Sequence, residues 1–248
     1  MQGFMTYTAQ EMRQYSRDYT STFFSFVVPA AMYIFFGLMY GDAAYGDAGM
    51  SYFETYTPAM IGTIIFITAM FSIGVPYVSL REGGVFKRFL ATPLTATAIV
   101  SSTLLRGVIM TTIGVLEMLI IGYFMFERQP TEYVFQFSLA FFLSTFSFFA
   151  FGFMITCFFK KVSAVLGFSF VLFYPMMFLS GATIPVESLP ESMQAVSAFI
   201  PLTYVIDIMQ LGWGGKLFTA DAIPSALFLL AMMVVCTTVA SKKFRWVD

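Results

Sequence analysis

The chain has 248 residues, of which 58% are hydrophobic and 11% charged, and its net charge is −1. A soluble domain needs a charged shell of about 25% Asp, Glu, Lys and Arg, so this composition excludes an ordinary soluble protein and predicts a membrane protein. A net charge near zero also argues against a nucleic-acid-binding surface. The sequence has no histidine, and Cys157 and Cys236 lie in separate apolar runs, so we expect two free thiols and no metal site.

The first twenty residues are polar, which argues against a cleaved signal peptide. Six apolar segments follow, each long enough to cross a bilayer core of about 30 Å, which takes about 20 helical residues. The predicted spans, in chain order, are Thr22–Tyr40, Pro58–Leu80, Pro93–Phe126, Tyr133–Phe159, Val162–Gly181 and Ala222–Ala240.

Basic residues are distributed unequally over the two sides of the predicted membrane. An even number of spans puts both termini on one side, and only Arg128 and Lys216 fall on the other side. The remaining Lys and Arg lie on the side of the termini: Arg13, Arg17, Arg81, Lys87, Arg88, Arg106, Lys160, Lys161, Lys242, Lys243 and Arg245. Because cytoplasmic segments carry the excess of Lys and Arg, the sequence predicts that both termini are cytoplasmic.

The cytoplasmic segment Arg81–Pro93 has the pattern of a short amphipathic helix. Its apolar residues recur at i, i+1, i+4 and i+5, which places them on one helical face: Val85, Phe86, Phe89 and Leu90. Lys87 and Arg88 lie on the opposite face. Such a helix can rest on the inner leaflet, or it can insert its apolar face into a groove on a soluble partner. The pattern is compatible with both interpretations.

The segment between the fifth and sixth spans predicts two short helices. Pro185, Pro190 and Pro201 punctuate residues 181–207, and the stretches between them are too apolar for a plain surface loop. We expect a re-entrant or interfacial hairpin at the outer leaflet, because irregular backbone at membrane depth must be satisfied by protein or water.

Two charged residues fall inside the predicted third span. Glu117 lies deep in it, and an intramembrane carboxyl is by default a functional hypothesis; a protonated acid or a structural pair with a neighbouring helix is the alternative. Arg106 lies near the inner end, where we expect its side chain to snorkel to the lipid headgroups.

The second and fifth spans each carry an apolar stripe at helical spacing. One stripe comprises Ala59, Gly62, Phe66, Met70 and Ile73, and the other comprises Gly167, Phe170, Tyr174, Met177 and Gly181. The glycines favour close helix packing. A path lined by the larger side chains would suit a hydrophobic or amphipathic cargo.

These segments resemble the ABC-2 type permeases, the membrane subunits of type-V, ABCG-like ATP-binding cassette exporters. The family's cytoplasmic pattern E-x-G-T-x-E-R-x-L-x-T-P is matched by Glu82, Gly84, Arg88, Leu90, Thr92 and Pro93. Val85 replaces the usual Thr, and Lys87 replaces the usual Glu. The outer pattern S-G-x-x-x-P, L-P and P-L-T-Y-x-x-D is matched by Ser180, Gly181, Pro185, Leu189, Pro190, Pro201, Leu202, Thr203, Tyr204 and Asp207.

The resemblance implies a subunit that is not itself an enzyme. The chain lacks the phosphate-binding pattern G-x-x-x-x-G-K-[ST], so ATP and Mg would be bound by a separate ATPase subunit. Contact with that subunit would be made by a coupling helix of Glu82, Gly84, Val85, Phe86, Lys87, Arg88, Phe89, Leu90 and Thr92. Residues 1–21 would contain an interfacial connecting helix, at about Gln10–Thr20.

The resemblance also implies an assembly of two permeases, identical or related, with two ATPases in the plasma membrane of a bacterium or archaeon. The second and fifth spans of each permease would line the translocation path, and the candidate residues for it are Phe66, Met70, Phe170, Tyr174, Met177 and Glu117. The outer hairpin would be built around Pro185, Pro190, Pro201, Tyr204 and Asp207. Membrane lipid is the other expected partner, and nucleic acid is not.

The predicted fold is an all-α integral membrane protein, a single ABC-2 type transmembrane domain over residues 1–248. It has six transmembrane helices, an N-terminal interfacial helix, a short cytoplasmic coupling helix and an outer re-entrant hairpin. The predicted function is export of a drug-like, lipid or peptide molecule, with lipid-linked polysaccharide as the alternative cargo. Three other functions are considered as alternatives. An ion-coupled transporter would need inverted repeats and several buried ionisable groups. A lipid-modifying enzyme would need a polar catalytic cluster, and a membrane scaffold would need no ATPase.

Overall fold

The computed structural model describes residues 2–15, 17, 19–40, 44–45, 50–85, 96–183 and 186–243, and the fold is given for these residues. The described chain is helical apart from two short antiparallel strands, β1 (Ala44–Tyr45) and β2 (Met50–Ser51). In this ladder Ala44 pairs with Ser51 and Tyr45 pairs with Met50. The all-α prediction is confirmed.

Two of the apolar segments contain a π-helical stretch, η1 or η2, between α-helical parts. The bounds are α1 Gln2–Tyr15, α2 Tyr19–Thr22, η1 Phe23–Val27, α3 Val28–Tyr40, α4 Tyr52–Ile67, η2 Thr68–Gly74, α5 Val75–Glu82, α7 Ala96–Phe126, α8 Val134–Thr156, α9 Val162–Leu179, the 3-10 turn η3 Val186–Ser188, α10 Glu191–Ser197, α11 Pro201–Trp213 and α12 Ala222–Lys243.

Five helices in the described residues are long and apolar enough to cross a membrane. They are Phe53–Glu82, Ala98–Phe126, Val134–Thr156, Val162–Leu179 and Ala222–Lys243, and they coincide with five of the six predicted spans. The predicted span Thr22–Tyr40 coincides with α2, η1 and α3, whose apolar helix Ser25–Tyr40 is shorter than a full crossing.

The start of the second span was predicted wrongly. Helix α4 begins at Tyr52, and Pro58 lies inside it rather than at its first turn. Proline is tolerated within membrane helices because neighbouring groups satisfy the carbonyl that it leaves free. Pro93, the predicted start of the third span, lies outside the described residues, in which α7 begins at Ala96.

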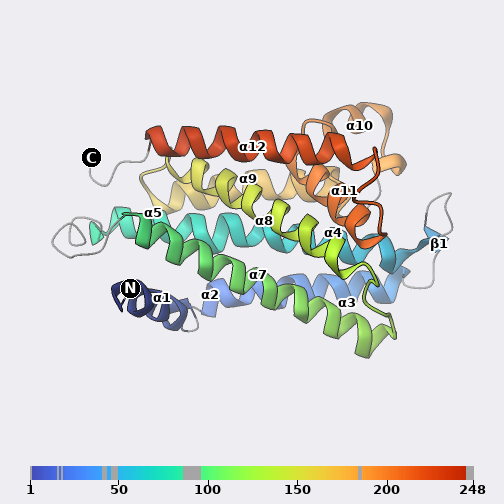
Figure 1. The fold of residues 1–248 in the computed structure, drawn as a ribbon, viewed down its shortest axis with the longest axis horizontal. Helices are drawn as coiled ribbons and strands as arrows, with labels where there is room; N and C mark the ends of the chain where they lie inside the picture. The colour runs from blue at the N-terminus through green and yellow to red at the C-terminus, as the bar shows by residue number, and fades with distance from the viewer. Residues whose placement is uncertain are drawn as a thin grey trace.

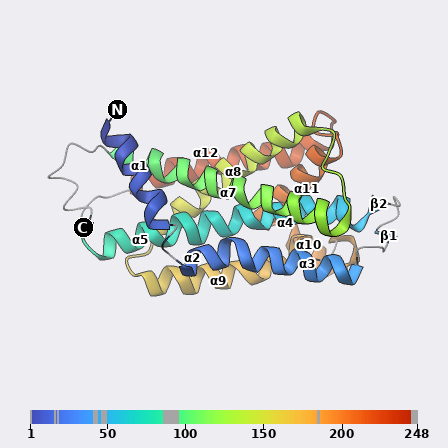
Figure 2. The same cartoon turned by 90° about the horizontal axis from the view of Figure 1, so that it is seen from below.

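The long helices run side by side along the length of the molecule (Figure 1). We call one end of this bundle the α1 end: it holds α1, the end of α5, the start of α7, the α8–α9 turn and the end of α12. The opposite end, the hairpin end, holds α10, the connection between α11 and α12, and the β-strands. Helix α1 crosses the bundle axis steeply at its end of the molecule (Figure 2).

The second span is the centre of the bundle. Ile61, Ile65, Phe66 and Met70 are fully enclosed by the chain's own helices. By contrast, α9 and α12 keep large apolar side chains exposed, such as Val171 on α9. A surface of this kind suits hydrocarbon, because lipid tails are as apolar as the side chains themselves.

The segment after α9 forms two short helices, as predicted. Helices α10 and α11 are bent by 86° relative to each other at a break after Ser197. Helix α11 packs against α4, where an added Cβ at Gly62 would lie 3.2 Å from Val205 and 3.3 Å from Ile206. Close packing at Gly62 therefore agrees with the prediction for this glycine; the depth of the hairpin in the membrane stays a prediction.

Candidate functional site

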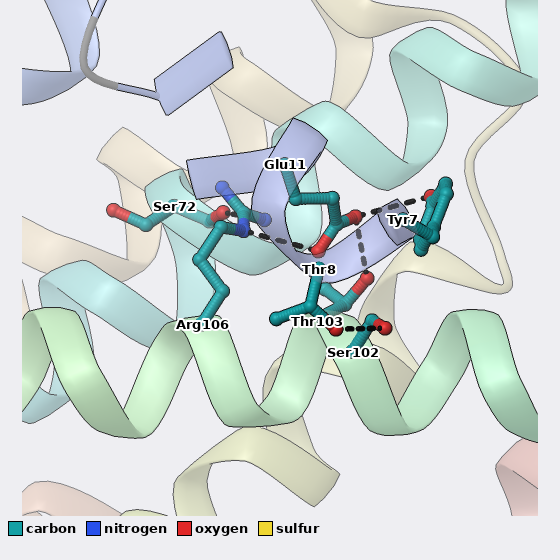
Figure 3. A network of polar contacts seen from close by, with 7 residues as sticks. All are labelled: Tyr7, Thr8, Glu11, Ser72, Ser102, Thr103 and Arg106. Atoms are coloured by element: carbon teal, nitrogen blue, oxygen red, sulfur yellow. Dashed lines mark hydrogen bonds and ion pairs between the residues drawn. The ribbon is translucent and has the colours of Figure 1, made fainter. Parts of the chain in front are cut away.

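A buried ion pair joins the N-terminal helix to the third span at the α1 end. Arg106 Nε on α7 lies 3.5 Å from Glu11 Oε2 on α1, and the two side chains are only 7% and 11% exposed (Figure 3). Helices α1 and α7 are far apart in sequence, so this pair fixes α1 to the membrane-spanning bundle. We call it, together with the hydroxyl contacts described next, the α1–α7 polar cluster.

Hydroxyl groups on both helices complete the cluster. The Glu11 carboxylate accepts hydrogen bonds from Thr103 Oγ1 at 3.0 Å and from Tyr7 Oη at 3.1 Å. One turn away, Thr8 and Ser102 share a hydrogen bond of 2.7 Å between their hydroxyls. A buried charge is tolerated only when it is paired and hydrogen-bonded, and Glu11 meets both conditions.

The cluster extends into both π-helical stretches. Arg106 Nη2 donates to the backbone carbonyl of Ser72 in η2 at 2.8 Å. The Ser72 hydroxyl lies 3.0 Å from the hydroxyl of Ser25 in η1, so the two share a hydrogen bond. π-Helical turns occur frequently at functional sites. A continuous series of polar contacts thus links α1 with the first three apolar segments of the bundle.

The snorkelling predicted for Arg106 is wrong. Arg106 is only 5% exposed. Its side chain points to Glu11 and Ser72 rather than to the headgroup layer. A cation in a span requires a counter-charge, and Glu11 supplies it from a helix that composition alone suggests is solvated. Helix α1, at Gln2–Tyr15, lies within the predicted residues 1–21 but begins earlier than the expected Gln10, and Tyr19 begins the next helix; its position at the membrane interface stays a prediction.

Tyr7 gives the cluster a pH dependence at alkaline pH. Burial, together with the neighbouring Glu11 carboxylate, raises the pKa of Tyr7 above its ordinary value, which is about 10. The unfolded chain therefore releases this proton at a lower pH than the folded chain, so stability is retained below pH ~10 and falls as pH rises above it. In Tyr7→Phe this loss of stability at alkaline pH is expected to vanish. Thermal unfolding in detergent from pH 8 to 11 would measure the difference between the two proteins. Parallel pH profiles for the two proteins would contradict this expectation.

Residues at the end of α5 are tied to the α8–α9 turn. Arg81 Nη2 donates to the carbonyl of Thr156 at 3.1 Å and also to that of Phe159. Glu82 Oε2 accepts a 2.7 Å hydrogen bond from the backbone N–H of Val162, at the start of α9. An acid at a helix N-terminus satisfies a free N–H and complements the helix dipole. We call these contacts the α5 clamp.

The predicted coupling helix begins at Glu82, which is part of the α5 clamp. Gly83 and Gly84 form a turn, in which Gly84 has φ 65°, and Val85 is the last described residue before the gap. The other predicted coupling residues lie outside the described residues: Phe86, Lys87, Arg88, Phe89, Leu90 and Thr92. Their role stays a prediction, whereas the clamp fixes the residues directly before them to the α8–α9 turn.

The candidate path residues fall into two groups. Phe66, Met70 and Met177 are buried among the chain's own helices, and the Phe66 ring stacks on Phe173 at 5.7 Å. Tyr174 is 55% exposed on α9 and stacks on the half-buried Phe170 at 6.3 Å. Within this chain the stripe of the second span is therefore core, whereas α9 presents Tyr174 outward.

The predicted close helix packing is not seen at the two glycines of the fifth span, Gly167 and Gly181, in the described part of the chain. An added Cβ at Gly167 would meet no atom within 4 Å, so this glycine makes no close helix contact within the described chain. Gly181 has φ 89°, a left-handed conformation that favours glycine, and it directs the chain out of α9.

Glu117 lies on α7 beside side chains that face outward. It is partly exposed, next to the exposed Leu116 and one turn from the exposed Ile113 and Ile120. Its Oε2 atom is buried and has no hydrogen-bond partner in the described part of the chain. The structural pair considered as an alternative is thus not seen there, and a functional role for Glu117 stays a hypothesis.

The hairpin residues hold α10 and α11 in place. Pro190 caps α10 and Pro201 begins α11, whereas Pro185 lies outside the described residues. Tyr204 donates to the carbonyl of Ala198 at 2.7 Å and stacks on Phe228 of α12 with ring centroids 3.9 Å apart. Asp207 accepts a hydrogen bond from Ser225 of α12.

Two sequence comparisons relate this chain to known proteins. A stretch of 36 residues is 50% identical to nodulation protein J of Rhizobium leguminosarum bv. viciae. That match covers 14% of this chain and 14% of the length of that protein. The profile of the ABC-2 type transporter family matches residues 2–212, which include the α1–α7 polar cluster, the α5 clamp and the hairpin. The chain belongs to the ABC-2 type transporter family.

Proposed function

We propose that this chain is the permease subunit of an ATP-driven exporter whose α1 end faces the cytoplasm. The observation that carries the orientation is the charge at the two ends. The exposed basic residues of the α1 end include Arg13, Lys160, Lys161, Lys242 and Lys243, and such an excess of Lys and Arg is typical of the cytoplasmic side. Membership of the ABC-2 type transporter family supports the use of ATP.

The energy for transport would come from a separate ATPase that contacts residues 82–92. The α5 clamp supports this assignment, because it ties the beginning of the segment to the α8–α9 turn through Arg81 and Glu82. A push on a segment fixed in this way is transmitted to α5, α8 and α9 together. Without the clamp, the same push would reach α5 alone.

The cargo would be hydrophobic or amphipathic and would pass between two permease copies. The outward face of α9 supports this, because Val171, Tyr174 and Phe178 are exposed on it. One hydroxyl among aromatic and aliphatic side chains suits a mainly apolar molecule with a polar group. A second copy placed against this face would enclose Tyr174 in a path.

Co-purification tests the ATPase contact. The full chain is expressed with a tag in its native host, extracted in mild detergent and analysed for co-purifying proteins. We expect a protein with a phosphate-binding loop to be captured, and the double variant Phe86→Asp, Phe89→Asp to lose at least ~90% of it, because two charges cannot enter an apolar groove. The matched control is Phe218→Asp, since Phe218 is 70% exposed at the hairpin end.

The outcomes separate the alternatives. Loss of capture in the double variant but not in the control supports the coupling helix. Capture that is equal in all three proteins assigns the contact to another surface. A folded chain that captures no ATPase, even after cross-linking, overturns the exporter proposal and leaves an ion-coupled transporter or a scaffold.

A further inference from the structure

A small pocket lies at the hairpin end, where α4 begins and where α7 and α11 end (Figure 1). Its volume is 270 Å³, slightly below the range of about 300–1,000 Å³ that is usual for ligand pockets, so it suits a small molecule. Its deep wall is formed by the buried side chains of Tyr33, Thr57 and Met118, which are at most 4% exposed. We call it the hairpin-end pocket.

The hairpin-end pocket combines apolar walls with charges of both signs. Met118 and Trp213 contribute apolar surface to it. The exposed acids Glu54 and Glu127 line the same pocket, together with the partly buried Arg128. A ligand with one charge would meet a like charge in so small a space, and like charges placed together are unfavourable. The lining therefore favours a ligand that carries both charges.

Arg128 is positioned to bind a carboxylate. Its Cζ atom lies 5.1 Å from the centroid of the buried Phe53 ring, and its backbone N–H donates to the carbonyl of Gly122 at 3.0 Å. A guanidinium held over an aromatic ring presents its N–H donors as a planar fork, which matches the two oxygens of a carboxylate. Because it has five such donors, it can bind a ligand in addition to acceptors of the chain itself.

Glu127 has a backbone conformation that disfavours a side chain. Its φ is 53°, and among the described residues every other one with a positive φ is a glycine. Helices commonly end with glycine in this left-handed conformation, because glycine has no Cβ. Strained residues of this kind cluster at ligand-binding sites. The position of Glu127 on the pocket gives a reason for a glutamate at a place that favours glycine.

We propose that the hairpin-end pocket binds a small zwitterion of the amino-acid type with an apolar side chain. Arg128 binds its carboxylate, Glu127 and Glu54 bind its ammonium group, and its side chain packs on Met118 and Trp213. Hydrogen bonds between ionised groups are about twice as strong as neutral ones. This site goes beyond the proposed function, in which the cargo passes along α9.

Trp213 reports on binding in this pocket. The sequence contains two tryptophans, so Trp246→Phe leaves Trp213 as the only one. The purified full chain with this change is titrated in detergent with L-leucine, with 4-methylpentanoate, which lacks the ammonium group, and with 3-methylbutylamine, which lacks the carboxylate. Fluorescence and calorimetry are measured on the same samples. We expect leucine to bind at least tenfold more tightly than either of the other two molecules.

Substitutions assign the charges. Arg128→Gln and Glu127→Gln are each expected to weaken leucine binding at least tenfold, because each leaves one ligand charge without its partner. The matched controls are Lys216→Gln and Glu132→Gln, since both residues are exposed and neither lines the pocket. Glu127→Gly should also lose binding, although its melting temperature should not fall, because glycine suits a φ of 53°.

The outcomes separate this site from other kinds of pocket. Equal binding of the amine and leucine would make it a site for organic cations, and equal binding of the acid and leucine would make it a site for anions. Either result overturns the proposal, as does the absence of both heat and fluorescence change with leucine. Unchanged binding in Arg128→Gln or Glu127→Gly overturns it as well. No ATPase is needed, so the result is independent of the test of the proposed function.

Discussion

Replacing Arg106 with methionine is expected to destabilise the protein by about 3–5 kcal/mol, because the change leaves the Glu11 carboxylate buried without its counter-charge. Glu11 would keep the hydrogen bonds from Thr103 and Tyr7, and these are too weak to compensate for a buried charge. The carbonyl of Ser72 would lose its donor at the same time. We expect α1 to detach from α7 before the rest of the bundle unfolds.

Thermal unfolding in detergent measures this effect. Arg13→Met is the matched control, because Arg13 is an exposed arginine on α1. The double variant Glu11→Leu, Arg106→Met removes both charges and should recover a large part of the loss, since replacing both partners of a buried pair by apolar residues is often close to neutral. If Arg106→Met is as stable as Arg13→Met, the ion pair contributes nothing and the cluster is incidental.

The change Gly152→Ala is expected to destabilise the contact between α8 and η2 by more than the 1–3 kcal/mol that is typical of an overpacked core. A Cβ at residue 152 would lie 2.6 Å from the carbonyl oxygen of Ala69 and 3.0 Å from its carbonyl carbon. Both atoms belong to backbone and cannot rotate away, so the two helices must separate. Gly74 lies at the same contact, where a Cβ would meet Thr156 at 2.9 Å.

A matched glycine makes this prediction specific. Gly167→Ala introduces the same methyl group into α9, where no atom lies within 4 Å. There we expect no loss, and a gain of about 0.5–1 kcal/mol from the better helix propensity of alanine. The melting temperatures of the two variants and of the parent protein show whether the added methyl group destabilises the protein only at position 152. Equal melting temperatures for Gly152→Ala and Gly167→Ala would show that α8 is free to move away from η2.

Most of the fold could be predicted because hydropathy and length determine where a helix can cross a bilayer. Five spans were found within a few residues, apart from the start of α4. That start was missed because the first residues of α4, which include Glu54, are less apolar than the run that begins at Pro58. The two-helix hairpin could also be predicted, since Pro190 and Pro201 mark the beginnings of its helices.

The polar cluster could not be predicted from the sequence in the same way. Glu11 lies in a polar stretch, which suggests a solvated side chain, and its partner Arg106 is 95 positions later. The available signal was the position of Arg106 inside a predicted span, because a cation there requires an acid nearby. The spacing of residues along one helix gives no information on which helix supplies that acid.

The π-helical stretch η2 sets the rotational phase of everything that follows it in the second span. A π turn contains about one residue more than an α turn, and one residue of an α-helix corresponds to about 100° of rotation. If Thr68–Gly74 were α-helical instead, with the same number of residues, the helix would therefore stay intact but the whole of α5 would be turned by about a quarter of a circle. Arg81 and Glu82 would then point away from the α8–α9 turn, although no atom of the clamp had been altered.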